Sequence, residues 1–164
     1  MGENRGHSEG FRHLVRNIAK RLLHALFFLR RGMTLGVRGA CFDADGRIFL
    51  VRHTYISGWH MPGGGVERGE TGLQALHKEI REEGNLVATS LPQLVHVYFN
   101  KRTSDRDHVL FYRLTVKQTV PKIPDREISE SGFFSLDALP EGTTPATRRR
   151  LAEVTGQATP DDYW

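Results

Sequence analysis

The sequence predicts an α/β fold, in which two or three helices cover a sheet of short strands. Three observations carry this prediction. β-prone runs alternate with turn signals, other segments have apolar residues at helical spacing, and the 164 residues suit one domain. The composition, 38% hydrophobic and 26% charged, is that of a globular protein and excludes the disordered and fibrous classes. Cys41 is the single cysteine, which excludes an intramolecular disulfide and a cysteine-based zinc cluster.

The strands are predicted from β-prone runs that lie between turn residues. The first two, Gly36–Phe42 and Arg47–Arg52, are joined by the turn sequence Asp-Ala-Asp-Gly at 43–46. Further strands are expected at Leu94–Phe99, Val109–Val116 and Gly132–Phe134. Loops are expected at Ser57–Gly65, which is rich in glycine, and at Pro121–Ser131.

Two helices of the domain are predicted from start signals and apolar spacing. Thr71 is a suitable N-cap for a helix that runs to about Glu83, with apolar residues at positions 73, 76 and 80. A closing helix is expected at Thr147–Thr155. The arginine triplet 148–150 is expected on the exposed side of this closing helix.

The basic character of the chain is concentrated in residues 1–31. This arm holds seven Lys or Arg and two Glu, a balance of +5, whereas residues 32–164 sum to −1. The nearly neutral body argues against a nucleic-acid-binding face over the whole domain, so DNA binding is not expected. We therefore divide the chain into an arm, 1–31, and a domain, 32–164.

The arm predicts a basic amphipathic helix, because apolar residues from Phe11 to Leu29 recur at helical spacing before a stop at Gly32. Three roles are open: packing on the domain or on a dimer mate, peripheral membrane contact, or attraction of an anionic substrate. Packing is favoured because most amphipathic helices cover apolar surface. No run is long enough to span a membrane and no signal peptide is evident, so a cytoplasmic location is predicted.

Glu79, Glu82 and Glu83 are the most informative residues, because their i, i+3, i+4 spacing puts three carboxylates on one helix face. Carboxylates that lie so close together repel one another and destabilise the helix unless a cation lies among them. Lys78 and Arg81 could each neutralise part of the charge, but Mg²⁺ or Mn²⁺ would suit oxygen ligands better. The alternative is an ordinary solvated acidic face.

A glycine run before this helix strengthens the metal interpretation. Gly63, Gly64 and Gly65 permit unusual backbone angles and close approach of a ligand, although a flexible turn is the simpler explanation. Glu67 and Glu70 continue the acidic series between the glycines and the helix. Together these segments predict an oxygen-rich cradle.

In this register the sequence resembles the Nudix hydrolases. Their signature is Gly, five residues, Glu, seven residues, Arg-Glu, an apolar residue, any residue, Glu-Glu, any residue, Gly and an apolar residue. This chain supplies Gly64, Glu70, Lys78-Glu79, Ile80, Glu82-Glu83, Asn85 and Leu86, so seven of the nine specified positions match. The family-like pattern extends over roughly Thr34 to Glu153.

The resemblance implies a Nudix-type α/β/α sandwich with a mixed sheet, preceded here by the amphipathic helix. It also implies hydrolysis of the diphosphate linkage in a nucleoside diphosphate derivative, dependent on Mg²⁺ with Mn²⁺ as a possible substitute. Sugar nucleotides, ADP-ribose-like molecules, nucleoside triphosphates and capped RNA ends all remain open. The alternative is a Nudix-like module that binds a nucleotide and regulates a partner without catalysis.

By the same resemblance, roles can be assigned to individual residues. The implied metal ligands are Glu79, Glu82, Glu83 and the Gly63 carbonyl, with Glu67 as an outer ligand. Glu70 is expected to brace the loop against the helix. The general base is Glu79 or Glu127, with Glu130 as a weaker third candidate.

Two positions depart from the signature. Lys78 replaces an arginine that orients the neighbouring glutamate, and it keeps the charge but loses the planar fork. Asn85 replaces a glycine, and asparagine can still end the helix in a left-handed conformation. Neither departure removes a metal-binding carboxylate, so we expect activity to survive both.

Substrate contacts are the least defined part of the prediction. Arg52, Gly64 and Gly65 are candidates for substrate binding. A phosphate or a base could also meet the ring residues near the glycine loop, which are His53, Tyr55, Trp59 and His60. Aromatic residues are more often core or loop anchors, and His60 is expected to pack or hydrogen-bond within its loop.

Overall fold

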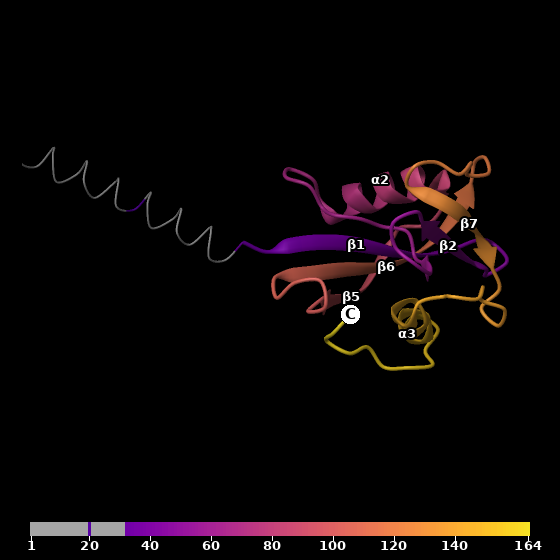
Figure 1. Ribbon diagram of the computed structural model, residues 1–164. Coiled ribbons are helices and arrows are strands. Elements are labelled where there is room, and N and C mark those ends of the chain that lie inside the picture. Colours follow the sequence, from indigo (N-terminus) through magenta and orange to yellow (C-terminus); the bar gives the residue numbers. More distant parts are fainter. Residues whose placement is uncertain (1–19, 21–31) are drawn as a thin grey trace, which may run out of the picture. The chain divides into compact units, whose positions relative to one another are not determined.

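The computed structural model describes Lys20 and residues 32–164 (Figure 1). Residues Thr34–Trp164 form one compact unit. The predicted arm, 1–31, lies outside the described residues except for Lys20, so its proposed packing, dimer and membrane roles stay predictions. In the described part of the chain, no helix is both long and apolar enough to cross a membrane.

Seven strands of the described region form a mixed sheet. They are β1 (Thr34–Phe42), β2 (Ile48–His53), β3 (Trp59–His60), β4 (Leu86–Ala88), β5 (Gln93–Phe99), β6 (Asp107–Gln118) and β7 (Ile128–Phe134). The main order is β3-β2-β1-β6-β4, with β7 also paired to β2 and β5 also paired to β6. β1 and β6 run parallel and the other pairs are antiparallel, which confirms the predicted mixed sheet.

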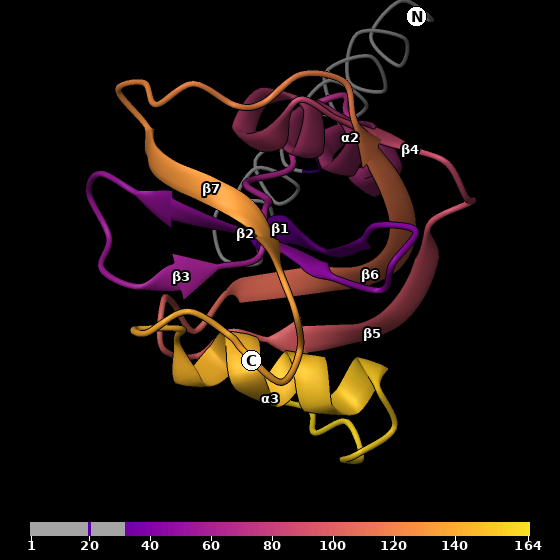
Figure 2. The same ribbon diagram turned by 90° about the vertical axis from the view of Figure 1, so that its right-hand side faces the viewer.

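Two helices lie on opposite sides of the sheet, α2 (Gly72–Gly84) and α3 (Pro145–Val154) (Figure 2). Alternate residues of β2 supply the two cores, as the two-residue period of a strand requires. Phe49 and Val51 belong to the core beneath α2, whereas Ile48 and Leu50 belong to the core beneath α3. The predicted α/β/α sandwich is therefore confirmed for the described residues.

The ends of α2 follow from local sequence. Thr71 accepts a hydrogen bond from the Gln74 backbone N–H, and the Gln74 side chain accepts one from the Thr71 N–H, which completes a capping box. At the other end Asn85 takes a left-handed conformation, with φ 52°. The predicted span of this helix and its predicted end at Asn85 are both confirmed. Glu79, Glu82 and Glu83 therefore lie on the helix as expected.

The structure has two strands that were not predicted and a third that begins earlier than predicted. Trp59 and His60 pair with Arg52 and Val51, so a short strand lies within the expected glycine-rich loop. β7 begins at Ile128, inside the expected loop 121–131, and β4 was not predicted. Each of these segments is extended because a neighbouring strand offers backbone hydrogen bonds, which local composition does not reveal.

Arg150 also differs from the prediction, because it is buried rather than on the exposed side of α3. Its side chain is 1% exposed, and its guanidinium donates to Glu153 Oε1 at 2.7 Å and to the Tyr163 carbonyl at 3.0 Å. The same group lies 3.9 Å from the centre of the Tyr98 ring. The C-terminal residues bring Trp164 against Tyr98 and thereby enclose the arginine.

Candidate functional site

The glycine loop runs so close to β1 and α2 that side chains would collide with it. Gly63 has φ 146°, and a Cβ there would lie 2.1 Å from the Val37 carbonyl oxygen. A Cβ on Gly64 would lie 2.6 Å from the Glu79 carboxylate. The loop is held there because the Val37 N–H donates to the Gly64 carbonyl at 2.8 Å. The loop backbone and Glu79 are therefore in direct contact, as the cradle prediction requires.

Glu83 is the buried carboxylate of the site. Only 3% of the residue is exposed, and its Oε2 accepts a hydrogen bond from the Gly63 N–H at 2.8 Å. Its Oε1 lies 3.5 Å from His53 Nε2. Burial raises the pKa of Glu83 to about 8, although the Arg38 guanidinium and the Gly63 N–H oppose that shift. A buried negative charge here needs more positive charge than the described residues provide.

Arg38 of β1 is the positive group nearest this loop and was missed by sequence reasoning. Its guanidinium donates to the Gly63 carbonyl and, at 3.5 Å, to the Met61 carbonyl. The Gly63 oxygen retains a second lone pair for another partner. The sequence did contain a signal for Arg38, because it is the single charged residue of the otherwise uncharged segment Thr34–Phe42.

Glu127 is brought to Glu83 by the pairing of β2 with β7. His53 is opposite Ile128, and the Thr54 N–H donates to the Glu127 carbonyl at 2.9 Å. His53, Glu83 and Glu127 each offer one ligand atom, and these atoms all lie within 4.8 Å of one another. Burial, with the charges of Arg38 and His60, lowers the pKa of His53 to about 4. This histidine is therefore neutral at pH 7.

The segment before Glu127 is tied to the end of α2. Lys122 Nζ donates to the Glu82 carbonyl at 2.7 Å and pairs with Asp125. Asp125 Oδ1 accepts from the Glu127 N–H at 2.9 Å and from the Ile128 N–H at 2.8 Å. These backbone hydrogen bonds and Lys122 lower the pKa of Asp125 to about 2. The Lys122–Asp125 pair thus fixes Glu127 beside the helix that carries Glu83.

Lys78 lies among the other carboxylates of the motif. Its Nζ is 3.3 Å from Glu70, 3.5 Å from Glu67 and 3.7 Å from Glu79. Glu70 also accepts a hydrogen bond from the Glu67 N–H at 3.0 Å, so it braces the segment before the helix. Burial raises the pKa of Glu79, and Lys78 opposes this shift. The lysine can therefore orient Glu79 without the planar fork of an arginine.

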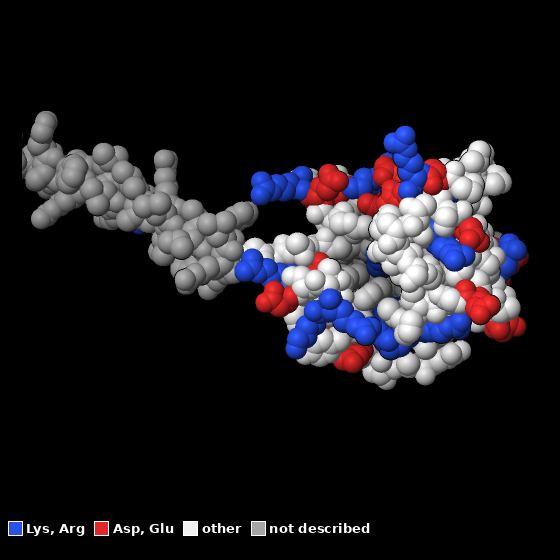
Figure 3. Space-filling model, in the orientation of Figure 1, with Lys and Arg blue, Asp and Glu red and all other residues white. Residues whose placement is uncertain are grey.

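Several predicted site residues are more exposed than Glu83. The Glu82 side chain is 59% exposed and lies 3.6 Å from Arg81, and Figure 3 shows acidic and basic side chains interspersed over α2. Arg52 pairs with Glu130 at 2.8 Å, and strand alternation puts it on the opposite face of β2 from His53. His60 bonds through Nε2 to the Ser57 carbonyl at 3.0 Å, so its predicted loop role is confirmed.

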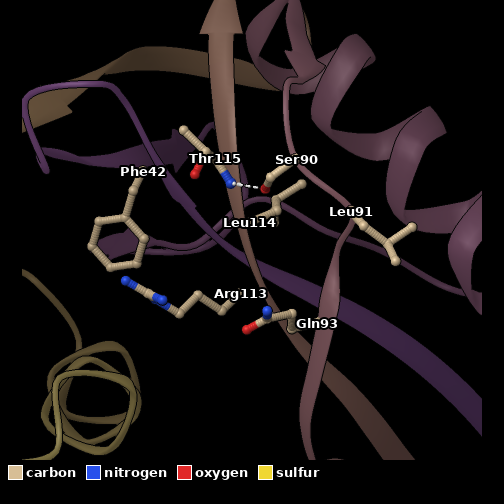
Figure 4. Close-up of a pocket in the computed structure, with 7 residues that line it drawn as sticks. All are labelled: Phe42, Ser90, Leu91, Gln93, Arg113, Leu114 and Thr115. Atoms are coloured by element: carbon tan, nitrogen blue, oxygen red, sulfur yellow. Dashed lines mark hydrogen bonds between the residues drawn. The ribbon is translucent and has the colours of Figure 1, made fainter.

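A separate hollow lies between the end of β1, the middle of β6 and the segment that joins β4 to β5. Its lining is Phe42, Ser90, Leu91, Gln93, Arg113, Leu114 and Thr115 (Figure 4). Ser90 Oγ accepts a hydrogen bond from the Thr115 N–H at 2.9 Å, and the Arg113 guanidinium lies 5.4 Å from the Phe42 ring centre. The lining contains no carboxylate, which separates this hollow chemically from the acidic site.

Comparison with known proteins identifies the family. Residues 33–154 match the sequence profile of the NUDIX domain. The chain belongs to the NUDIX domain family. The glycine loop and α2 are therefore the family's motif, and the predicted resemblance is confirmed.

Curated relatives match the NUDIX chain over short segments. An RNA pyrophosphohydrolase of Halorhodospira halophila is 48% identical over 42 residues, which cover 26% of this chain and 23% of that protein. An RNA pyrophosphohydrolase of Stenotrophomonas maltophilia is 38% identical over 53 residues, or 32% of this chain and 24% of that protein. The matched segments thus span about a quarter of the length of these relatives.

Solved structures resemble the NUDIX chain over most of their length. A MutT NUDIX hydrolase from Burkholderia pseudomallei has a TM-score of 0.62 at 26% identity, covering 74% of this chain and 97% of that one. An ADP-ribose pyrophosphatase from Streptococcus suis has a TM-score of 0.57 at 26% identity, covering 77% and 94%. These similarities confirm the predicted fold class.

Proposed function

We propose that this protein is a Mg²⁺-dependent hydrolase that cleaves the diphosphate linkage of a nucleoside diphosphate derivative. The observation that carries the proposal is the Glu83 carboxylate, which is buried, bonded to the Gly63 N–H and close to a ligand atom of Glu127. Its position in a NUDIX motif supports the reaction class. The matched relatives are named RNA pyrophosphohydrolase and ADP-ribose pyrophosphatase, and both names denote cleavage of a diphosphate linkage.

A divalent cation fits the donor set of the site. Carboxylate and carbonyl oxygens are the ligands that Mg²⁺ and Mn²⁺ take. Burial raises the pKa of Glu83 although Arg38 opposes the shift, so a bound cation would favour the ionised carboxylate. Glu79, Glu82, Glu83 and the Gly63 carbonyl would hold the cation, with Glu67 as an outer ligand. When bound, such a cation neutralises phosphate charge and lowers the pKa of water.

The protein's own groups orient the reactants. Lys78 holds Glu79, and the Gly63 N–H holds Glu83. Gly64 and Gly65 leave room for a phosphate against the loop backbone, whereas the pairing of Arg52 with Glu130 argues for a structural role of that arginine. We propose Glu127 as the general base, because it is exposed to solvent and held beside the buried cluster. Glu79 is the alternative base.

The first experiment is a Mg²⁺-dependent hydrolysis screen over nucleoside diphosphate derivatives, with Glu83→Gln as the control. Turnover of one substrate class that is lost in E83Q supports the proposal and identifies the substrate. Wild-type rates in E83Q would contradict the ligand assignment. No turnover across the panel, with nucleotides still raising the melting temperature, would instead support a non-catalytic nucleotide-binding module.

The general base is tested by Glu127→Gln in the same assay. Loss of a positioned base costs roughly 10²–10⁴-fold in rate, and we expect a fall in this range for E127Q. A fall of less than a few-fold would transfer the role to Glu79.

The remaining proposals concern the arm and the location of the protein. We propose that residues 1–31 form an arm distinct from the domain 32–164, that the arm packs on the domain or in a homodimer, and that the protein is cytoplasmic. Deletion of residues 1–31, followed by measurement of oligomer size and of liposome binding, tests the arm. A loss of liposome binding with unchanged size would favour the membrane role instead.

A further inference from the structure

His53 lies among the acidic residues of the site but has no counterpart in the sequence motif. We infer that His53 supplies a nitrogen ligand to the cation held by Glu83, so that nitrogen and oxygen ligands share the site, beside the proposed base Glu127. The inference rests on the proposed function, from which it takes the binding of a divalent cation near Glu83.

The geometry brings one imidazole and two carboxylates together from three different parts of the chain. His53 ends β2, Glu83 lies in the last turn of α2, and Glu127 immediately precedes β7. His53 Nε2 lies 3.5 Å from Glu83 Oε1, and one ligand atom of each residue falls within 4.8 Å of the others. Ligands about 2.0–2.2 Å from a metal lie within about 4.4 Å of each other, so the observed spacing of up to 4.8 Å is close to that of groups arranged around one ion.

His53 is buried although neither ring nitrogen makes a short hydrogen bond to a described residue. The residue is 6% exposed, and its Nδ1 has no hydrogen-bond partner among the described residues. Its Nε2 approaches Glu83 only at 3.5 Å, the outer limit of a hydrogen bond. Buried polar atoms in proteins are nearly always bonded. A buried ring with no short hydrogen bond, and with its Nε2 facing the Glu83 carboxylate, fits a ligand better than a packing residue.

His60 provides an internal contrast. Its ring lies 5.8 Å from that of His53, but its Nε2 bonds to the Ser57 carbonyl at 3.0 Å. That nitrogen is therefore occupied within its own loop. The two histidines are neighbours with different hydrogen-bonding states, which makes His60 the matched control for His53.

A nitrogen ligand changes which cations the site prefers. Imidazole suits Zn²⁺ and other late transition metals, whereas Mg²⁺ favours oxygen ligands. Loss of His53 should therefore weaken Co²⁺ and Zn²⁺ binding much more than Mg²⁺ binding. We expect at least a ~10-fold loss for Co²⁺ and Zn²⁺, the effect that even indirect partners of metal ligands produce.

The decisive measurement is the pulsed electron paramagnetic resonance spectrum of the full chain with one equivalent of Mn²⁺. A coordinated imidazole couples its nitrogen to the Mn²⁺ electron spin. We expect this coupling in the wild type and in His60→Gln, and its loss in His53→Gln and His53→Asn. Absence of nitrogen coupling in the wild type, or its persistence in both His53 variants, would overturn the inference without any requirement that the variants fold well.

Calorimetric titration separates a ligand from a positioning residue. A selective loss of Co²⁺ and Zn²⁺ affinity in H53Q supports ligation, whereas an equal loss for Mg²⁺ would show that His53 only positions Glu83 and would overturn the inference. Failure of the proposed function is distinguishable from both. A protein without turnover that retains nitrogen coupling would refute the hydrolase, and an active hydrolase without the coupling would refute only the role of His53.

Discussion

Glu83 illustrates how one residue combines position and charge. The burial that fixes its carboxylate against the Gly63 N–H also makes ionisation costly, which is why its pKa is raised to about 8. In the unfolded chain the same group ionises at its ordinary value of 4.5. The free energy of unfolding of the metal-free protein must therefore depend on pH through the ionisation of Glu83.

We expect the metal-free protein to lose stability as the pH rises from 6.5 to 8. In this window the native state holds a proton on Glu83 that the unfolded state has released, so a higher pH favours unfolding, by at most ~1.4 kcal/mol per pH unit. His53, whose pKa is lowered to about 4 in the folded state, has an opposing effect that fades as the unfolded chain loses the histidine proton above its ordinary value of 6.5. Urea unfolding at several pH values measures the slope.

Glu83→Gln is the control for this pH dependence. The slope should disappear in E83Q, and also in the wild type at saturating Mg²⁺, where the carboxylate is ionised at every pH of the series. If the free energy of unfolding of E83Q falls with pH as steeply as that of the wild type, the proton is held by a group other than Glu83.

Cys41 gives a second prediction at this scale. The thiol is fully buried, and burial raises its pKa well above the ordinary value. Because the thiolate is the reactive form, we expect no reaction with a thiol reagent such as Ellman's reagent in the folded protein and one equivalent in urea. Rapid labelling under native conditions would contradict the burial.

At the scale of elements, the end of α2 depends on a residue that replaces the family's glycine. Asn85 adopts φ 52°, and its amide lies 3.4 Å from the carbonyl oxygens of Val120 and Pro121. The left-handed conformation costs an ordinary side chain about 1–2 kcal/mol. We therefore expect Asn85→Ala to be less stable than Asn85→Gly by about 1 kcal/mol in urea unfolding. Equal stabilities would mean that the helix ends differently in solution.

The segment 119–127 is an element whose position is set by Lys122. Loss of its bonds to the Glu82 carbonyl and to Asp125 should release Glu127 from the site. Displacement by about 1 Å can cost 10²-fold in rate, so Lys122→Ala should lower kcat/KM by about 10-fold or more. Lys101→Ala, in an exposed turn, is the control and should retain the wild-type rate. An unchanged rate in K122A would show that Glu127 is held by other contacts.

At the scale of the whole molecule, one face of the sheet carries the candidate site and the other face carries a separate buried cluster. The acidic site lies on the α2 side, and the α3 side is closed by Arg150 between Tyr98, Glu153 and Trp164. Removal of one partner from a buried ion pair typically costs about 3–5 kcal/mol. We expect Arg150→Ala to destabilise the protein by about 3 kcal/mol or more, as measured by urea unfolding.

Arg149→Ala is the matched control, because Arg149 is the exposed neighbour of Arg150 on α3. It should change the free energy of unfolding by less than about 0.5 kcal/mol, as surface substitutions usually do. Below the unfolding transition, R150A should still bind Mg²⁺ with wild-type affinity. A large loss of affinity in the folded variant would show that the two faces are coupled.

Local patterns accounted for much of the fold and for part of the site. The N-cap at Thr71, the helix end at Asn85 and the contact of Lys78 with Glu79 all involve residues close together in the chain. Such interactions can be read from spacing. The short strand at Trp59–His60 and the burial of Arg150 could not, because both depend on partners far away in sequence.

The sequence by itself determined that three glutamates of one helix follow a glycine loop, since a helix converts spacing into position. Tertiary structure alone decided that Glu83 is buried while Glu82 is exposed. It also decided that Arg38, His53 and Glu127 join Glu83 from three separate strands or their ends. The reason is that strand pairing and burial arise from contacts between distant segments, and their register is set by the whole sheet rather than by neighbouring residues.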